Sequence, residues 1–116
     1  MLSKYLAKNE LIAFKLLILK NKLYLDWCFL LLNKDKFIVL EREKTKTGFF
    51  ITMKRYLTFL GLKNYLEYNF QYCTESKTYI GSLMLWISET TLDFECVIFN
   101  DFLPDEFIFE NFSEIE

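Results

Sequence analysis

From Tyr65 to Tyr72 the chain reads YLEYNFQY, and this stretch decides the fold class. Leucine, tyrosine and phenylalanine alternate there with glutamate, asparagine and glutamine. A period of two is typical of a β-strand with one buried face. A polar turn, Thr74 to Lys77, follows directly. The stretch therefore predicts a strand that leads into a tight hairpin and turns its apolar side chains toward a core.

Three more strands are expected after this turn, at residues 78–87, 91–100 and 106–112. In the second of them, Leu92, Phe94, Cys96 and Ile98 alternate with Thr91, Asp93, Glu95, Val97 and Phe99. Pro104 precedes the last strand and favours a sheet edge, since proline cannot donate to a ladder. A parallel crossover takes about a dozen residues or more, so connections this short predict antiparallel neighbours. We expect an antiparallel β-meander of about four strands in residues 65–116.

The N-terminal third has a different period. Its polar positions recur at steps of four and seven, at Lys4, Lys8, Lys15, Lys22, Asp26 and Asn33. This spacing favours helices with one polar stripe, divided near residues 20–22. Two strands at residues 12–19 and 23–32 remain the alternative, because short apolar runs are compatible with both helices and strands.

The lysines in residues 11–32 also argue against a membrane span. A charge near the centre of a bilayer costs about 2.5–3.5 kcal/mol, and this segment contains Lys15, Lys20, Lys22 and Asp26. Neither a span nor a cleavable signal peptide is expected. We therefore expect a cytoplasmic protein with no membrane partner.

Between the two halves, Phe37 to Leu40 predicts a short strand within residues 36–42. Phe50, Met53, Leu57 and Leu60 recur at steps of three and four, which predicts a helix ending at Gly61. With helices first and strands later, residues 1–116 are expected to form a single α+β domain. Its residues 1–64 are expected to be mainly helical and basic, and residues 65–116 a β-meander with an acidic surplus.

The composition excludes several kinds of site. The chain has 116 residues, 53% of them apolar, and no histidine. Triads that use histidine and His-ligated metal sites are therefore excluded. No Gly-rich phosphate loop is present, so we expect neither an enzyme nor a cofactor. Cys28, Cys73 and Cys96 form no Cys-x-x-Cys pair. We interpret them as buried free thiols in a reducing compartment, with a reactive nucleophile as the alternative.

Charge is divided unequally along the chain. All 14 Lys and Arg lie in residues 4–77, whereas residues 78–116 contain nine acids and no basic residue. One interpretation is an ordinary solvated or internally paired surface. The other is an acidic surface that steers a basic partner. The candidate partner-binding residues are Trp86, Glu89, Asp93, Glu95, Asp101, Asp105, Glu106 and Glu110.

Trp86 stands apart from the other aromatic residues because its face of the expected strand also carries Ser82, Met84 and Ser88. A tryptophan in this setting is either a buried anchor of the sheet or an exposed interface residue. The carboxylates Asp93 and Glu95 share a strand face about 7 Å apart. We interpret them as solvated groups rather than a catalytic pair.

Residues 79–88 (YIGSLMLWIS) and 92–98 (LDFECVI) resemble the C-terminal hairpin of small bacterial immunity proteins of the TriTu type. This family belongs to polymorphic-toxin and contact-dependent growth-inhibition systems. The matching positions are Gly81, Leu85, Trp86, Ser88, Asp93, Phe94 and Glu95, with Phe107, Phe109 and Phe112 as a closing strand. The turn at residues 88–91 lacks the expected glycine, and residues 102–104 lengthen the last connection.

The resemblance implies a cytoplasmic antagonist that binds its cognate toxin directly and blocks it without catalysis. Together with the acidic segment, it predicts a partner with a basic surface, such as a nuclease. Two alternatives remain open. Lys54, Arg55 and Lys63, near Tyr56, Phe59 and Tyr65, could bind nucleic acid, although the chain is acidic overall. The apolar N-terminal helices could instead form a homodimer.

Overall fold

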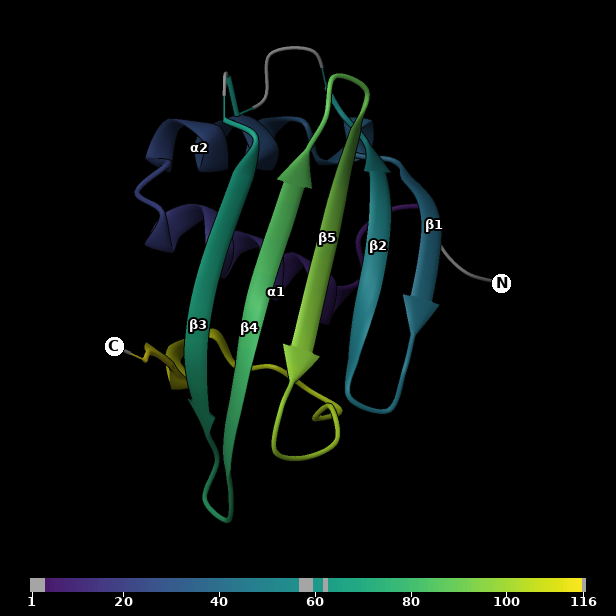
Figure 1. Cartoon of the computed structure of the whole chain (residues 1–116). Helices are drawn as coiled ribbons and strands as arrows, with labels where there is room; N and C mark the ends of the chain where they lie inside the picture. Colours follow the sequence, from purple (N-terminus) through teal and green to yellow (C-terminus); the bar gives the residue numbers. More distant parts are fainter. Residues whose placement is uncertain (1–3, 57–59, 62, 116) are drawn as a thin grey trace.

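A computed structural model describes residues 4–56, 60–61 and 63–115. Two helices precede a six-stranded sheet (Figure 1). The helices are α1 (Lys8–Lys20) and α2 (Tyr24–Leu32), and the strands are β1 (Val39–Lys44), β2 (Gly48–Lys54), β3 (Tyr65–Cys73), β4 (Thr78–Ile87), β5 (Thr91–Ile98) and β6 (Phe112–Glu114). Two short 3-10 turns, η1 (Lys34–Lys36) and η2 (Phe109–Asn111), complete the elements. The α+β prediction is confirmed, with six strands rather than about four.

All neighbouring strands are antiparallel, in the order β1-β2-β5-β4-β3-β6. The expected meander is present as β3, β4 and β5. The N-terminal hairpin of β1 and β2 adds to it, because β2 pairs along its whole length with β5. A Cβ on Gly48 would overlap the carbonyl oxygen of Cys96, so glycine permits this close approach. Two hairpins from different parts of the chain therefore make one surface.

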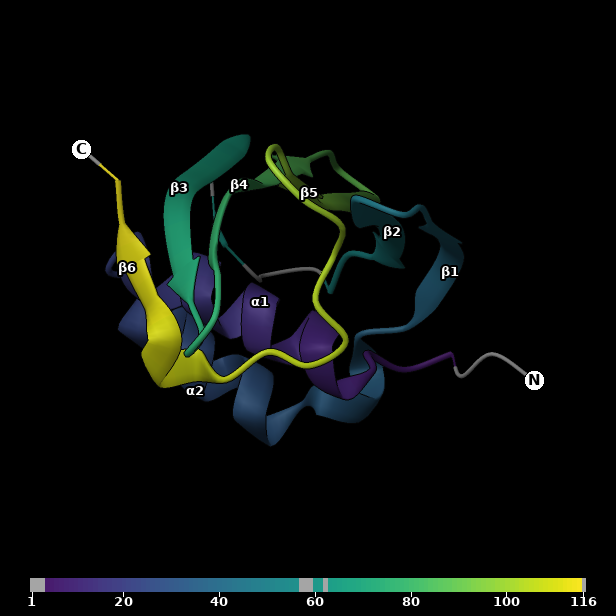
Figure 2. The same cartoon turned by 90° about the horizontal axis from the view of Figure 1, so that it is seen from below.

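The molecule is layered (Figure 2). The helix α1 covers one face of the sheet, which we call the inner face, and α2 lies beyond α1 on the side away from the sheet. On the inner face, Phe94 of β5 is fully buried. Its ring meets Phe14 of α1 edge to face at a centroid distance of 5.2 Å and Phe49 of β2 at 5.8 Å. These contacts join the helix layer to both hairpins.

The helical interpretation of the N-terminal third is confirmed, and the two-strand alternative is wrong. The break falls at the predicted place, since Asn21 caps α1 and Lys22 adopts a positive φ of 62°. The side chain of Asn21 donates to the Leu17 carbonyl at 2.8 Å, which satisfies one of the free carbonyls at the end of the helix. Residues of α1 are buried on both sides because α1 lies between the sheet and α2.

The predicted helix from Phe50 to Gly61 is wrong where the structure describes it. Residues 48–54 form β2, in which Phe49, Ile51 and Met53 face the core. Phe50 on the opposite side is also apolar, so helical and strand periods both fit the sequence. Gly61 has a positive φ of 55° but lies in a turn rather than at a helix end. Positions 57–59 and 62 of this prediction lie outside the described residues.

The predicted strand at residues 106–112 is also wrong, because β6 begins only at Phe112 and pairs with β3. In this segment the backbone amides donate to side chains and not to the backbone of a neighbouring strand. The amide of Phe107 donates to Asn9 Oδ1 at 3.0 Å, and that of Ile108 donates to the Tyr72 hydroxyl at 2.9 Å. The segment thus crosses beside α1 without joining the sheet until its last residues.

The cysteines differ in burial. Cys96 is buried on the inner face, where loss of solvent raises the pKa of its thiol. Cys73 is half-buried, and Cys28 is exposed on α2, so the prediction of a buried thiol is wrong for Cys28. Its exposure follows from the outermost position of α2.

Candidate partner-binding site

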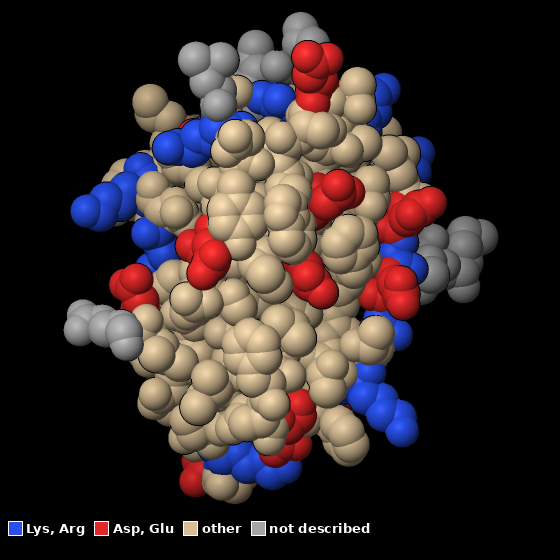
Figure 3. All heavy atoms as spheres, viewed as in Figure 1, with Lys and Arg blue, Asp and Glu red and all other residues tan. Residues whose placement is uncertain are grey.

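The face of the sheet opposite α1, which we call the outer face, lies in front of both helices (Figures 1 and 3). An antiparallel sheet can keep one face in water when its strands alternate, and β5 does so along its whole length. In Figure 3, acidic side chains are spread around an uncharged centre, and Lys and Arg gather at the margins. The outer face is therefore the most distinctive surface of the described part of the chain.

Two rows of directly opposed residues cross the outer face. In strand order from β1 to β3, the first row is Glu43, Phe50, Glu95, Met84 and Glu67, and the second is Glu41, Thr52, Asp93, Trp86 and Tyr65. In the first row an apolar side chain separates each pair of glutamates. Since neighbouring strands are about 4.8 Å apart, the strand positions of these glutamates are about 10 Å apart. This spacing limits repulsion while keeping the whole row anionic.

The second row has an aromatic end. Trp86 and Tyr65 are each 40% exposed, and their ring centroids lie 5.7 Å apart. The Tyr65 hydroxyl donates to Glu67 Oε2 at 2.7 Å. Partial burial and this carboxylate raise the pKa of Tyr65 to about 12, so the hydroxyl stays neutral at physiological pH. The interpretation of Trp86 as a buried anchor is wrong, because an exposed indole lies beside a second aromatic ring.

The central carboxylates have no cationic partner among the described residues. Asp93 Oδ1 accepts a hydrogen bond from the Thr52 hydroxyl at 3.0 Å, and Glu95 lies between Phe50 and Met84. The ion pairs in the described part of the chain are Lys8–Glu106, Arg42–Glu10 and Lys77–Asp101. None of them uses an acid from the two rows, so the outer face keeps its negative charge.

The structure brings together only half of the predicted site. Trp86, Asp93 and Glu95 lie on the outer face, and Glu89 lies in the turn between β4 and β5 at one end of it. Asp101 pairs with Lys77 at 3.2 Å. Its pKa is lowered first by the Phe102 amide and then by Lys77. The other three candidates follow β5 on the C-terminal segment beside the helices, namely Asp105, Glu106 and Glu110.

Seven residues of the two rows were not predicted for the site: Glu41, Glu43, Phe50, Thr52, Tyr65, Glu67 and Met84. Two of the acids, Glu41 and Glu43, lie in the segment with the surplus of basic residues. The net charge of that segment therefore did not indicate that Glu41 and Glu43 belong to an acidic surface. Only the pairing of β2 with β5 shows that acids from both halves share one surface.

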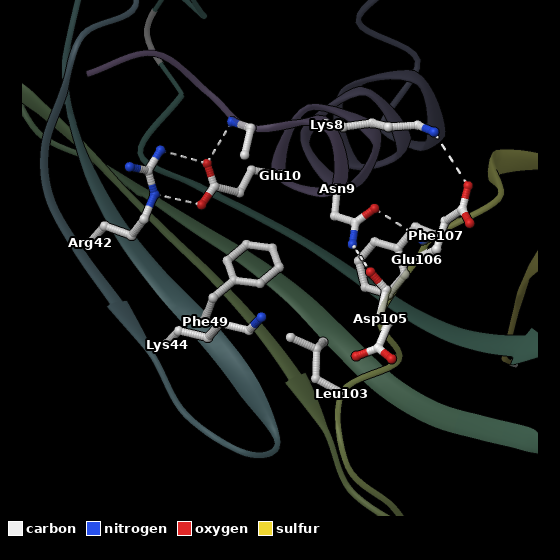
Figure 4. A pocket seen from close by; sticks show the side chains of 11 residues that line it. Lys8, Asn9, Glu10, Arg42, Lys44, Phe49, Leu103, Asp105, Glu106 and Phe107 are labelled. Atoms are coloured by element: carbon white, nitrogen blue, oxygen red, sulfur yellow. Dashed lines mark hydrogen bonds and ion pairs between the residues drawn. The ribbon is translucent and has the colours of Figure 1, made fainter. Parts of the chain in front are cut away.

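A cleft of about 490 Å³ opens elsewhere, between the start of α1, β1 and β2, and residues 103–107 (Figure 4). Most of its polar side chains bind one another. Arg42 donates to both carboxylate oxygens of Glu10 at 2.7 Å, and these hydrogen bonds raise the pKa of the guanidinium. Asn9 binds the Asp105 carbonyl at 2.8 Å and the Phe107 amide at 3.0 Å. The cleft therefore marks where the C-terminal segment is attached to α1.

Neither a metal site nor a membrane-spanning helix is found in the described part of the chain. No group of three or more Cys, Asp or Glu side chains there is arranged to hold a metal ion. None of the described helices is long and apolar enough to cross a membrane.

Comparison with known proteins adds no assignment. No protein-family model, no curated protein and no solved structure matches this chain.

Proposed function

We propose that this protein is an immunity protein that binds a basic toxin domain with the outer face of its sheet and neutralises it without catalysis. One observation carries the proposal. The two rows of the outer face combine an exposed Trp86–Tyr65 pair with Asp93, Glu95 and glutamates of β1 and β3 that no described cation neutralises. The hairpin of β4 and β5, which resembles TriTu-type immunity proteins, forms the centre of this face.

The chemistry of the rows fits a partner rich in lysine and arginine. Acidic groups with no internal counter-ion steer a cationic partner and speed its encounter. The Trp86 and Tyr65 rings supply exposed apolar area at one end of the second row, and aromatic residues of this kind carry much of the energy of an interface. An arginine can also stack on an indole while it binds a carboxylate, since cation–π contacts favour tryptophan.

The proposal is tested with the product of the neighbouring reading frame, which an immunity function predicts to contain a toxin domain. Replacement of Glu95 by lysine should slow association at least ten-fold at low salt and flatten its salt dependence, because charge steering acts mainly on the association rate. The matched control is Asp105→Lys, the same charge reversal beside the cleft on another side of the molecule. Association rates come from stopped-flow fluorescence at two salt concentrations.

Equal slowing by both variants would show that total charge, and not the outer face, controls association. A wild-type protein that does not bind the neighbouring product would remove the immunity function itself. The expected outcome is slow association for Glu95→Lys alone, with neutralisation of the toxin lost in parallel.

The nucleic-acid alternative gains no support from the basic segment. The Tyr56 ring lies 5.3 Å from Phe29 and beneath the Lys36 ammonium at 4.9 Å. Arg55 donates to the carbonyls of Ser88 and Gly61 at 2.9 and 2.6 Å. These groups hold the ends of strands together and do not form a free stacking platform for bases.

A further inference from the structure

Helix α2 exposes an apolar face to solvent. Leu25 and Leu32 are 86% and 83% exposed, and Tyr24, Cys28 and Leu31 are also exposed. Because successive helical residues are about 100° apart, these five positions fall in one arc of about 120°. No polar side chain interrupts this arc, which we call the α2 face. A contiguous apolar surface of this kind marks an interaction site.

The α2 face lies on the opposite side of the molecule from the acidic rows. Of the nine residues of α2, only Leu30 is fully buried, and α1 separates α2 from the sheet (Figure 2). Whatever covers the α2 face therefore leaves the outer face of the sheet free. The inference does not depend on the proposed toxin-binding function.

Lysines border the α2 face at both ends. Lys20 and Lys22 precede the helix and Lys34 and Lys36 follow it, and all four are exposed. None of them forms an ion pair with another described residue. Of the two acids nearby, Asp26 accepts a hydrogen bond from the Leu60 amide, and Asp35 stands exposed between the second pair of lysines. The border is therefore cationic.

We propose that the α2 face binds an anionic lipid surface, with the helix lying in the plane of the membrane interface. The leucines enter the boundary of the acyl chains, and Lys20, Lys22 and Lys34 reach the headgroup phosphates, as in other interfacial helices with basic borders. Lys36 adds to the positive charge of the border while its ammonium contacts Tyr56. Lysine stems favour this placement because they pack on apolar surface while their ammonium groups stay in water. Tyr24 suits the same boundary, where amphipathic rings concentrate.

Charge favours a lipid surface over a second copy of the chain. A symmetric dimer through α2 brings the same lysines together from both molecules, and like charges oppose that contact. An anionic membrane attracts the lysines and repels the acidic outer face. Both effects favour the orientation in which the α2 face meets the membrane. This proposal departs from the expectation of no membrane partner, which rested on charges that oppose a spanning helix, because an interfacial helix does not span.

The test uses the full chain and sedimentation with vesicles of phosphatidylglycerol and phosphatidylcholine. We expect binding to equimolar vesicles at low salt and at least ten-fold weaker binding to pure phosphatidylcholine. The double variant Leu25→Gln with Leu32→Gln should lower the partition coefficient at least ten-fold. The matched control is Phe99→Gln with Phe102→Gln, since these rings are exposed to 66% and 64% but lie outside α2.

Cys28 supplies a second readout at the centre of the α2 face. In a Cys73→Ser background, anionic vesicles should slow alkylation of Cys28 by a polar maleimide at least five-fold. The proposal is overturned if wild-type protein does not bind anionic vesicles, or if both double variants lose binding equally. It is also overturned if sedimentation shows a dimer that Leu25→Gln with Leu32→Gln dissociates, since a second copy then covers the face.

Discussion

The two faces of this sheet are built from alternate residues of the same strands and have opposite properties. Along β5, Phe94 is fully buried against α1 and β2, and its neighbour Asp93 is half-buried on the outer face and accepts one hydrogen bond there. Leu85 and Trp86 repeat the contrast on β4. The difference shows that stability and binding occupy adjacent positions and can be separated one residue at a time. Because the acids of the rows lie on the outer face and not in the core, the fold tolerates them without cationic partners.

The largest expected effect tests the contrast directly, by truncating one aromatic residue on each face. Phe94→Ala should lower the free energy of unfolding by about 4 kcal/mol, because it leaves a cavity where Phe14, Phe49 and Phe94 meet. Trp86→Ala should cost less than about 1 kcal/mol, since the indole is 40% exposed. Urea denaturation measures both values. Similar losses for the two variants would mean that Trp86 also supports the fold.

The second prediction compares a buried acid with an exposed one. Glu10→Gln should lower the free energy of unfolding by about 3 kcal/mol, because it leaves Arg42 without its counter-ion in a mostly buried setting. Glu43→Gln, on the outer face of the same strand that carries Arg42, should change it by no more than about 0.5 kcal/mol. Thermal and urea denaturation of the two variants decide the point. An equally small effect for Glu10 would show that the pair is fully hydrated.

The smallest effect concerns a polar group on the inner face. The buried Tyr68 hydroxyl has no hydrogen-bond partner among the described residues, and burial raises the pKa of Tyr68 to about 12. Tyr68→Phe should therefore raise the free energy of unfolding by up to about 1 kcal/mol at pH 7.

The advantage of Tyr68→Phe should grow with pH. Between the unfolded pKa of about 10 and the folded value of about 12, the native state holds a proton that the unfolded state releases, so rising pH removes stability from the wild type. Urea denaturation of wild type and variant at pH 7 and pH 11 measures the difference. A constant difference between the two pH values would contradict the assigned cause.

The sequence predicts the strands correctly where the alternation of apolar residues and the polar turns mark the same boundaries. Residues 65–72 and 91–98 largely alternate, and polar turns bound the apolar run at residues 78–87, so β3, β4 and β5 follow from local chemistry. In β2, Phe49 and Phe50 make both faces apolar, and the period is ambiguous. The C-terminal segment depends on side-chain partners, Asn9 and Tyr72, that no local pattern reveals.

The residues of the candidate site also fall into two groups, those that local alternation identifies and those that join through strand pairing. Trp86, Asp93 and Glu95 share a face by simple alternation, and the sequence identified them. Glu43 and Glu67 join them only through strand pairing, Glu43 by way of β2 and Glu67 by way of β4. Conversely, Asp105 and Glu106 were predicted for the same site because they follow in the acidic segment, but the chain turns away from the sheet after β5. Tertiary pairing, and not local charge density, determines which acids act together.

The attachment of the C-terminal segment to the start of α1 has a consequence for biosynthesis. Asn9 can form its hydrogen bonds to the backbone only after residues 105–107 have left the ribosome. In the same way, β2 can pair with β5 only after β5 has been synthesised. Until then a nascent chain holds its most apolar helices with no sheet to cover them, a state that favours capture by chaperones. The outer face is therefore complete only after β5 has been synthesised and has paired with β2.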